Sequence, residues 1–174
     1  MRVTLFMAIS ANGLIAQEDG SEDFLSHENW ETFASLVAQF GNFIVGSKTY
    51  EAVKSWDEPY GLDDFPNADR VIVSDNPNYQ LDQGYTLANS PHDALKHLQE
   101  KGFKKALLTG GATSNSSFAK AGLIDEIILN IEPIIVGKGI PLFRPENFQL
   151  SLELIESKPI AKGILQLRYR TRKS

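Results

Sequence analysis

Short runs of apolar residues recur along the chain, and each has the length of a buried β-strand. The runs lie at 3–10, 43–45, 70–74, 105–109 and 126–135. Turn-forming residues separate them. Asn12-Gly13 breaks the first run and leads into a polar, acidic loop at 16–23, which is long enough to act as a mobile flap. The runs predict the strands of a sheet.

Between these strands, apolar residues recur at helical spacing. Trp30, Phe33 and Val37 share one face of a predicted helix that begins after the N-cap candidate Ser26 and ends at Gly41. Three further helices are predicted to begin near Ser47, Ser90 and Ala112. The third of these four helices has the clearest start, because Ser90 is followed by proline and then by an acid.

Short strands that alternate with helices of about ten residues predict βαβ units and a mostly parallel sheet. Segments 150–156 and 163–170 predict a C-terminal hairpin, and so an antiparallel edge. The chain has 174 residues, of which 42% are hydrophobic, so we expect one domain, 1–174, with a sizeable core. In such sheets, ligands bind outside the carboxyl ends of the strands.

Composition excludes several kinds of chemistry. There are 17 Lys and Arg against 22 Asp and Glu, a net charge of −5, which speaks against a nucleic-acid partner. Cysteine is absent and the three histidines lack metal-ligand spacing, so no metal site is expected. No apolar stretch approaches the ~20 residues of a membrane span. We therefore expect a cytoplasmic protein with no membrane partner.

Two strand-to-helix turns combine glycine with hydroxyl residues. The first reads Gly46-Ser47-Lys48-Thr49 and the second reads Gly110-Gly111-Ala112-Thr113. Glycine lets a ligand approach the backbone, and a helix N-terminus offers N–H groups to a phosphate. Either turn alone could also be a tight connection with an ordinary cap. Together they predict a site for a nucleotide with several phosphates, and Ser74, after the next strand, is a weaker candidate.

The chain resembles the dihydrofolate reductase superfamily in three motifs that follow in order: MAISANGLIA at 7–16, IVGSKTY at 44–50 and TGGA at 109–112. Its last third, with PIIVGKGIPLF at 133–143, is similar to the reductase domain of riboflavin biosynthesis. The resemblance covers nearly the whole chain. It implies a three-layer αβα fold around a mixed, mostly parallel sheet, and an NADPH-dependent reductase activity. It also implies a homodimer, for which 133–143 and the last strands offer an apolar surface.

The resemblance implies NADPH as cofactor and assigns residues to it. Ala8 and Ile15 match the positions that line the nicotinamide pocket. The turn Gly46-Ser47-Lys48-Thr49 matches the one that holds the adenosine phosphates, with Lys48 placed to meet the 2′-phosphate. The turn Gly110-Gly111-Ala112-Thr113 matches the one against the pyrophosphate, and Ser74 matches the family's serine after the middle strand.

The substrate side departs from both families. Dihydrofolate reductases carry an acid early in the first helix, where this chain has Trp30 flanked by Glu28 and Glu31. Riboflavin-type reductases carry lysine after the first turn and glutamate before the double glycine, where this chain has Leu14 and Thr109. The charges expected around a phosphoribosyl-amino pyrimidine are therefore missing. The resemblance thus supports binding of the families' cofactor more strongly than binding of either family's substrate.

Glu28, Trp30 and Glu31 are the catalytic candidates. Trp30 has two explanations, core packing and stacking on a ligand, of which core packing is slightly favoured. Glu28 and Glu31, like His27 and Asp23, are close enough in sequence to carry a proton, yet each also fits a solvated or capping residue. A bound water is the alternative proton source.

Three functions fit the sequence. The first is an NADPH-dependent reductase of a small heterocyclic or conjugated substrate with a C=N or C=C bond. The second is a riboflavin-pathway pyrimidine reductase with a substituted site. The third is a dinucleotide-binding module without catalysis. Turnover of the pyrimidine substrate, or the absence of any turnover despite NADPH binding, would distinguish them.

Overall fold

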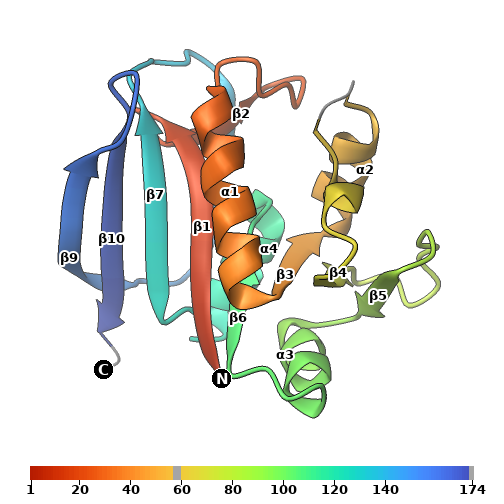
Figure 1. The fold of residues 1–174 in the computed structure, drawn as a ribbon. Coiled ribbons are helices and arrows are strands. Elements are labelled where there is room, and N and C mark those ends of the chain that lie inside the picture. Colours follow the sequence, from red (N-terminus) through yellow and green to blue (C-terminus); the bar gives the residue numbers. More distant parts are fainter. Residues whose placement is uncertain (57–59, 173–174) are drawn as a thin grey trace.

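The structure is a computed structural model that describes residues 1–56 and 60–172. Over those residues, the centre is an eight-stranded sheet in the order β5-β4-β3-β6-β1-β7-β10-β9 (Figure 1). Its strands are β1 Arg2–Ser10, β3 Asn42–Gly46, β4 Asp69–Val73, β5 Tyr85–Ala88, β6 Lys105–Leu108, β7 Glu126–Glu132, β9 Ser151–Pro159 and β10 Leu165–Arg172. The pairings from β5 to β7 are parallel, and β10 runs antiparallel to both β7 and β9.

Helices cover both faces of this sheet. They are α1 His27–Phe40, α2 Ser47–Lys54, α3 Pro91–Glu100 and α4 Ala112–Lys120, with a short 3-10 helix at Leu62–Asp64. Apolar residues of α1 and α2 pack on one face of the sheet, and those of α3 and α4 pack on the other. The expected three-layer αβα fold with a mostly parallel sheet and a C-terminal antiparallel hairpin is thus confirmed (Figure 1).

The alternation of side chains along β1 shows why the strand is apolar throughout. Val3 and Leu5 point into the core under α3 and α4, whereas Phe6 points into the core under α1 and α2. A strand covered on both faces has no position left for a solvated side chain, so it appears as a continuous apolar run. The same holds for β3, all five residues of which are buried.

A second, two-stranded sheet was not predicted from the sequence. It pairs β2 Leu14–Gln17 with β8 Gly139–Pro141 in antiparallel orientation. The loop expected at 16–23 is therefore wrong for its first two residues, since Ala16 and Gln17 belong to β2. Strands of three or four residues carry too little pattern to recognise, and the partner of β2 lies more than a hundred residues away along the chain.

Both predicted N-cap residues begin their helices, but only one caps through its side chain. The Ser90 Oγ accepts a hydrogen bond from the Asp93 N–H at 3.1 Å, as expected of an N-cap. Ser26 has the extended backbone of an N-cap before α1, but its side chain forms no capping hydrogen bond. Its Oγ instead donates to Glu132 on β7 at 3.1 Å, so a distant carboxylate has replaced the local contact.

None of the helices in the described residues is long and apolar enough to cross a membrane.

Candidate active site

The two glycine turns lie next to each other at the carboxyl edge of the sheet. β3 and β6 are neighbours, with Ile44 opposite Leu108. Just beyond these strands, the Gly46 N–H donates a hydrogen bond to the Gly110 oxygen at 2.8 Å. Two segments more than sixty residues apart in sequence therefore form one continuous rim, from which α2 and α4 begin.

Close contacts at this rim explain the glycines. A Cβ on Gly46 would overlap the Oγ of Ser114, and one on Gly111 would lie 2.6 Å from the Oγ1 of Thr49. Gly46 and Gly111 are also the N-cap residues of α2 and α4, so neither helix has a side chain that caps its first N–H groups. Two uncapped helix starts side by side fit a pyrophosphate, which binds to backbone N–H groups and favours the positive end of the helix dipole.

The remaining cofactor candidates surround this rim. Lys48 is exposed in the first turn of α2, beside Ser47. Ala112 is buried at the start of α4, and the Oγ1 of Thr113 accepts a hydrogen bond from Arg144 at 3.2 Å. Ser74 is buried beyond the end of β4, and its Oγ accepts from the Asn76 N–H at 3.2 Å. In this structure the Thr113 and Ser74 hydroxyls thus accept hydrogen bonds from other residues of the chain.

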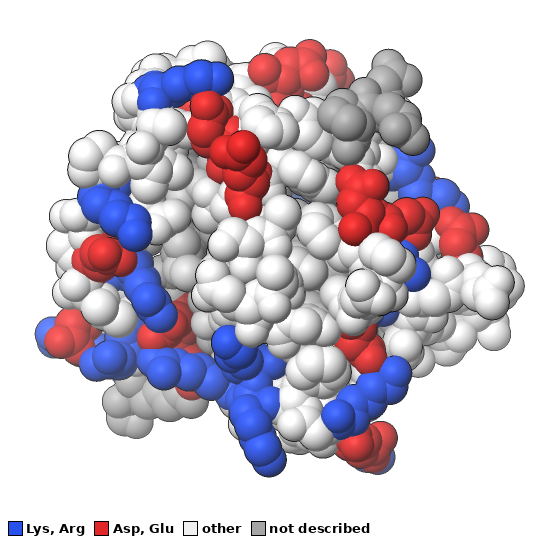
Figure 2. Space-filling view, viewed as in Figure 1, with Lys and Arg blue, Asp and Glu red and all other residues white. Residues whose placement is uncertain are grey.

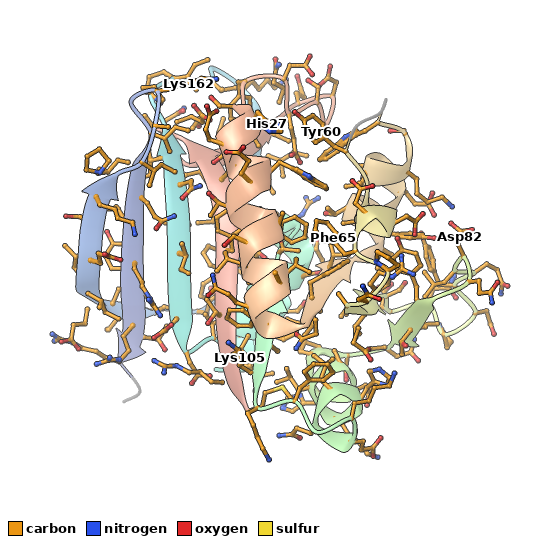
Figure 3. All side chains as sticks on the ribbon, in the orientation of Figure 1. His27, Tyr60, Phe65, Asp82, Lys105 and Lys162 are labelled. Atoms are coloured by element: carbon orange, nitrogen blue, oxygen red, sulfur yellow. The ribbon has the colours of Figure 1, made fainter. Side chains whose placement is uncertain are left out.

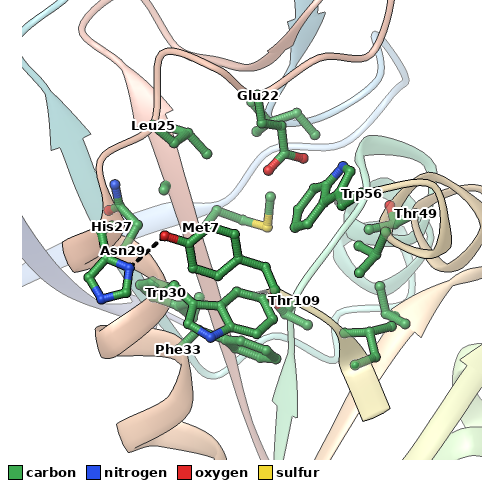
Figure 4. Close-up of a pocket in the computed structure, with 18 of the residues that line it drawn as sticks. Met7, Glu22, Leu25, His27, Asn29, Trp30, Phe33, Thr49, Trp56 and Thr109 are labelled. Atoms are coloured by element: carbon green, nitrogen blue, oxygen red, sulfur yellow. Dashed lines mark hydrogen bonds between the residues drawn. The ribbon is translucent and has the colours of Figure 1, made fainter. Parts of the chain in front are cut away.

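A cavity of about 450 Å³ adjoins the rim, between α1 and α2 (Figure 4). Its volume lies within the roughly 300–1,000 Å³ typical of small-molecule sites. Ala8 and Ile15, the expected nicotinamide contacts, both line it. Thr49 and Gly111 line it as well, so the cavity opens directly onto the two turns. The structure thus brings the expected nicotinamide residues together with Thr49 and Gly111, one residue from each glycine turn.

Aromatic rings form much of the cavity wall. The Trp30 ring lies 5.3 Å from Tyr60 and 5.4 Å from Phe33, and Trp56 lies on the side of α2. Trp30 packs on Phe33 of the core, as one explanation for it expected, and it also lines the cavity, where stacking on a ligand stays a prediction. Trp56 had the same two explanations as Trp30, whereas Tyr60 was not predicted as a site residue, and nothing local distinguishes it from an ordinary loop aromatic.

Glu22 is a carboxyl inside this cavity that the sequence did not single out. Figure 4 shows its side chain turned into the cavity from the loop before α1. Burial raises the pKa of Glu22 to about 7. In the sequence it is one acid within an acidic loop, and only the folded loop distinguishes it from its exposed neighbour Asp23.

The carboxylates that were predicted as catalytic candidates lie elsewhere. Glu28 forms an ion pair with Lys162 at 2.9 Å, and this hydrogen bond from Lys162 holds the pKa of the Glu28 carboxyl below its ordinary value. Glu31 is exposed and lies 3.5 Å from His27. Neither is among the described residues that line the cavity. Their catalytic role stays a prediction.

His27 and Tyr60 join across the mouth of the cavity. The His27 Nδ1 and the Tyr60 hydroxyl are 2.6 Å apart, and Figure 3 shows both side chains at the same end of the molecule. This contact links the first residue of α1 to the segment after α2. It closes part of the gap between the two helices above Trp30, which lies 5.3 Å from the Tyr60 ring.

A buried carboxylate holds the start of α1 on the sheet. Glu132, at the end of β7, accepts hydrogen bonds from the Ser26 N–H at 2.7 Å and from the Asn29 side chain at 2.6 Å. Asn130 donates to Asn29 from the same strand at 3.0 Å. These contacts fix the first turn of α1, and with it the positions of His27 and Trp30 in the cavity wall.

Comparisons with known proteins agree with this geometry. Residues 1–166 match the RibD C-terminal domain. The chain is 31% identical over 175 residues to the uncharacterized protein YwjB of Bacillus subtilis, covering 97% of each chain. A crystal structure of a putative riboflavin biosynthesis protein from Shewanella sp. PV-4 superposes with a TM-score of 0.81 at 27% identity, covering 99% of this chain and 100% of that one.

A dihydrofolate reductase from Enterococcus faecalis, in complex with NADP(H), has the same fold. Its TM-score is 0.71 at 15% identity, covering 99% of this chain and 97% of that one. The expected resemblance to the dihydrofolate reductase superfamily, and to its riboflavin-biosynthesis branch, is confirmed. The chain belongs to the RibD C-terminal domain family.

Proposed function

We propose that the protein is an NADPH-dependent reductase of a small heterocyclic or conjugated compound with a C=N or C=C bond. The observation that carries the proposal is the contact between the turns at Gly46 and Gly110 beside an aromatic cavity. When bound, the dinucleotide supplies a hydride. The membership of the RibD C-terminal domain family supports a reductase.

The protein's part in this reaction is to bind, orient and exclude water. The turns at 46–49 and 110–113 hold the pyrophosphate and adenosine phosphates. Ala8 and Ile15 offer a flat apolar surface to the nicotinamide, and Trp30, Trp56 and Tyr60 leave space for a planar acceptor beside it. A site closed to water favours hydride transfer because the reacting groups are held together in a low-dielectric environment.

A titration of NADPH into the protein, followed by NADPH fluorescence, tests this proposal. We expect saturable binding with a Kd below about 100 μM, within the usual range for enzyme ligands. The variant Gly137→Ala is a control for glycine substitutions in this titration and should bind NADPH as the unmodified protein does, because its added methyl meets nothing within 4 Å. Absence of binding by the unmodified protein at that concentration would overturn the proposal.

Family membership favours a second candidate, a pyrimidine reductase of the riboflavin pathway. The cavity speaks against it, because none of the described residues that line it is lysine or arginine, whereas Glu22 and Asp23 are acidic. A phosphorylated substrate needs cations or N–H groups around its phosphate. Turnover of the phosphoribosyl-amino pyrimidine at a rate comparable to that of any unphosphorylated substrate would favour the second candidate instead.

Lys48 is the proposed contact for the 2′-phosphate of NADPH. It is exposed and forms no ion pair with a residue that the structure describes. We expect Lys48→Ala to raise the Kd of NADPH about tenfold, or ~1.4 kcal/mol, and to leave the Kd of NADH unchanged. Fluorescence titrations with both dinucleotides measure this.

The matched control for Lys48 is Lys54→Ala, on the same helix. Lys54 is paired with Asp82 at 2.8 Å, in the last turn of α2. Lys54→Ala should leave the affinities for NADPH and for NADH unchanged. Equal losses for NADPH and NADH in Lys48→Ala would show that Lys48 supports the helix and not the selection of the phosphate.

The proposal includes a homodimer formed through β9. This strand is the edge of the sheet and is exposed along its whole length, with Leu154 54% and Ile155 42% exposed (Figure 1). Long edge strands that expose apolar side chains are normally covered in soluble proteins. Two-fold pairing of an edge strand with its copy is antiparallel, which brings the acid Glu153 of one copy towards the Lys158 end of the other. A second copy is therefore the proposed occupant.

Leu154→Lys is expected to convert the dimer to a monomer, because a lysine on an edge strand opposes strand pairing. Light scattering over a concentration series measures the mass. Gln80→Lys adds the same charge at an exposed position outside the β9–β10 hairpin and should leave the mass unchanged. A monomeric unmodified protein, or a Leu154→Lys variant that stays dimeric, would contradict the arrangement.

A further inference from the structure

We infer that Glu22 is the acid that protonates the substrate during reduction, and that this substrate carries no phosphate. The inference rests on the proposed reductase function and assigns the proton donor that the function requires.

The Glu22 carboxyl is held at the wall of the cavity by its loop. Glu22 lies in the loop between β2 and α1, whose backbone is fixed by hydrogen bonds from Gln17 to Ser21 and from Leu25 to Glu22, both 2.8 Å. In Figure 4 the carboxyl reaches into the cavity on the side of Trp56. It thus lies within the space that a planar acceptor would occupy, on the wall opposite to Trp30.

The Glu22 carboxyl faces the cavity without a polar partner among the described residues. Within the described residues, the Glu22 carboxyl has no hydrogen bond and no ion pair. The titratable groups that line the cavity with it are Asp23, His27 and Tyr60, and the last two bind each other. A carboxyl that faces apolar rings without a cation favours its neutral form. The pKa of about 7 for Glu22 agrees with this.

A neutral carboxyl suits the reaction. Hydride transfer brings two electrons to the carbon of a C=N bond, and the nitrogen then needs a proton. The Glu22 O–H bond breaks as the N–H bond forms, which leaves a carboxylate that takes up a proton from water before the next turnover. Atoms and charge balance with NADPH as the reductant, and no other co-reactant is required.

The surroundings define the class of substrate. Figure 2 shows acidic side chains gathered mainly at the upper end of this face, where α1 begins, and lysines and arginines mainly along the lower edge. The cavity itself has two acids and, in its described lining, no lysine or arginine. A phosphate would meet no cation here, whereas the nitrogen of a planar imine can accept a hydrogen bond from the neutral Glu22 carboxyl. A cyclic imine or related heterocycle fits this description.

The test compares the unmodified protein with Glu22→Gln and Glu18→Gln. Glu18 belongs to the same loop but is exposed and paired with Lys138, outside the cavity. NMR titration of side-chain-labelled glutamate should find one carboxyl with a pKa of about 7 that disappears only in Glu22→Gln. With dihydroisoquinoline as a cyclic imine probe, the unmodified protein should show a fall in rate above that pH that is absent in Glu22→Gln, because only the protonated acid donates and protonation of the imine itself affects both proteins alike.

Glu22→Gln should bind NADPH as the unmodified protein does but reduce the imine about 100-fold more slowly, since general acid catalysis contributes roughly that factor. Titration of Glu22 near the ordinary glutamate pKa of 4.5, or an unchanged rate and pH profile in Glu22→Gln, would overturn the inference. Failure of the unmodified protein to bind NADPH would overturn the proposed function instead. As a second probe, cyclohexenone offers a conjugated C=C bond. Binding of NADPH without reduction of either the imine or cyclohexenone would exclude the acid role of Glu22 and leave a dinucleotide-binding module.

Discussion

Replacing Gly46 with alanine is expected to weaken NADPH binding at least about 100-fold, or ~2.7 kcal/mol, and to destabilise the fold by about 1–3 kcal/mol. The reason is steric, because the new methyl group would overlap the Ser114 Oγ at the start of α4. Unless the buried Ser114 side chain turns away, α4 or β3 must then move, which separates the two turns that hold the pyrophosphate. Fluorescence titration measures the affinity, and urea unfolding measures the stability.

A double variant shows whether the overlap with Ser114, and not a general loss of folding, causes the weaker binding. In Gly46→Ala combined with Ser114→Ala, the nearest remaining atom is the Ser114 Cβ, 3.4 Å from the added methyl, which is an ordinary contact. Stability and NADPH affinity should therefore largely return, a non-additivity that a double-mutant cycle detects. Normal affinity in the single variant would show that the contact between the turns does not matter for the dinucleotide.

Glu132→Ala is expected to cost about 3 kcal/mol of unfolding free energy, because donors that now bind a carboxylate would be left without an acceptor. Glu132 is only 4% exposed and accepts from the Ser26 N–H, the Ser26 Oγ and the Asn29 side chain. The start of α1 would lose its attachment to β7. Urea unfolding followed by tryptophan fluorescence measures the change.

Two further variants show whether the loss of unfolding free energy comes from the buried carboxylate of Glu132. Glu132→Gln keeps one acceptor oxygen and should lose less than Glu132→Ala. Glu31→Ala removes an acid from the same end of the molecule. Because the Glu31 side chain is 65% exposed, this variant should lose less than about 0.5 kcal/mol of unfolding free energy. If the Glu31 and Glu132 variants were equally stable, the buried network would not be what anchors α1.

The sequence predicted the fold well because its signals are local. The buried strands β1 and β3 are apolar runs, and the helix from Ser90 shows its cap within four residues. The glycine turns could also be recognised, since Gly46 and Gly110 follow apolar strands directly. That they touch could be inferred only from the rule that parallel strands end at a common edge.

What the sequence did not predict depends on contacts between distant segments. Ser26 was predicted to cap α1 locally, but its Oγ binds Glu132, 106 residues away. β2 has a recognisable partner only once β8 is folded beside it. Glu22 and Tyr60 reach the cavity through loops whose path no periodicity describes. The substrate side of the site was therefore harder to predict than the cofactor side.

The central claim is that the turns at Gly46 and Gly110 hold one dinucleotide whose nicotinamide enters the aromatic cavity. A crystal structure of the NADP complex tests it most directly. The account predicts the pyrophosphate between the N-termini of α2 and α4, and the nicotinamide ring against Ala8 and Ile15. A dinucleotide bound away from this rim, or a nicotinamide outside the cavity, would contradict it.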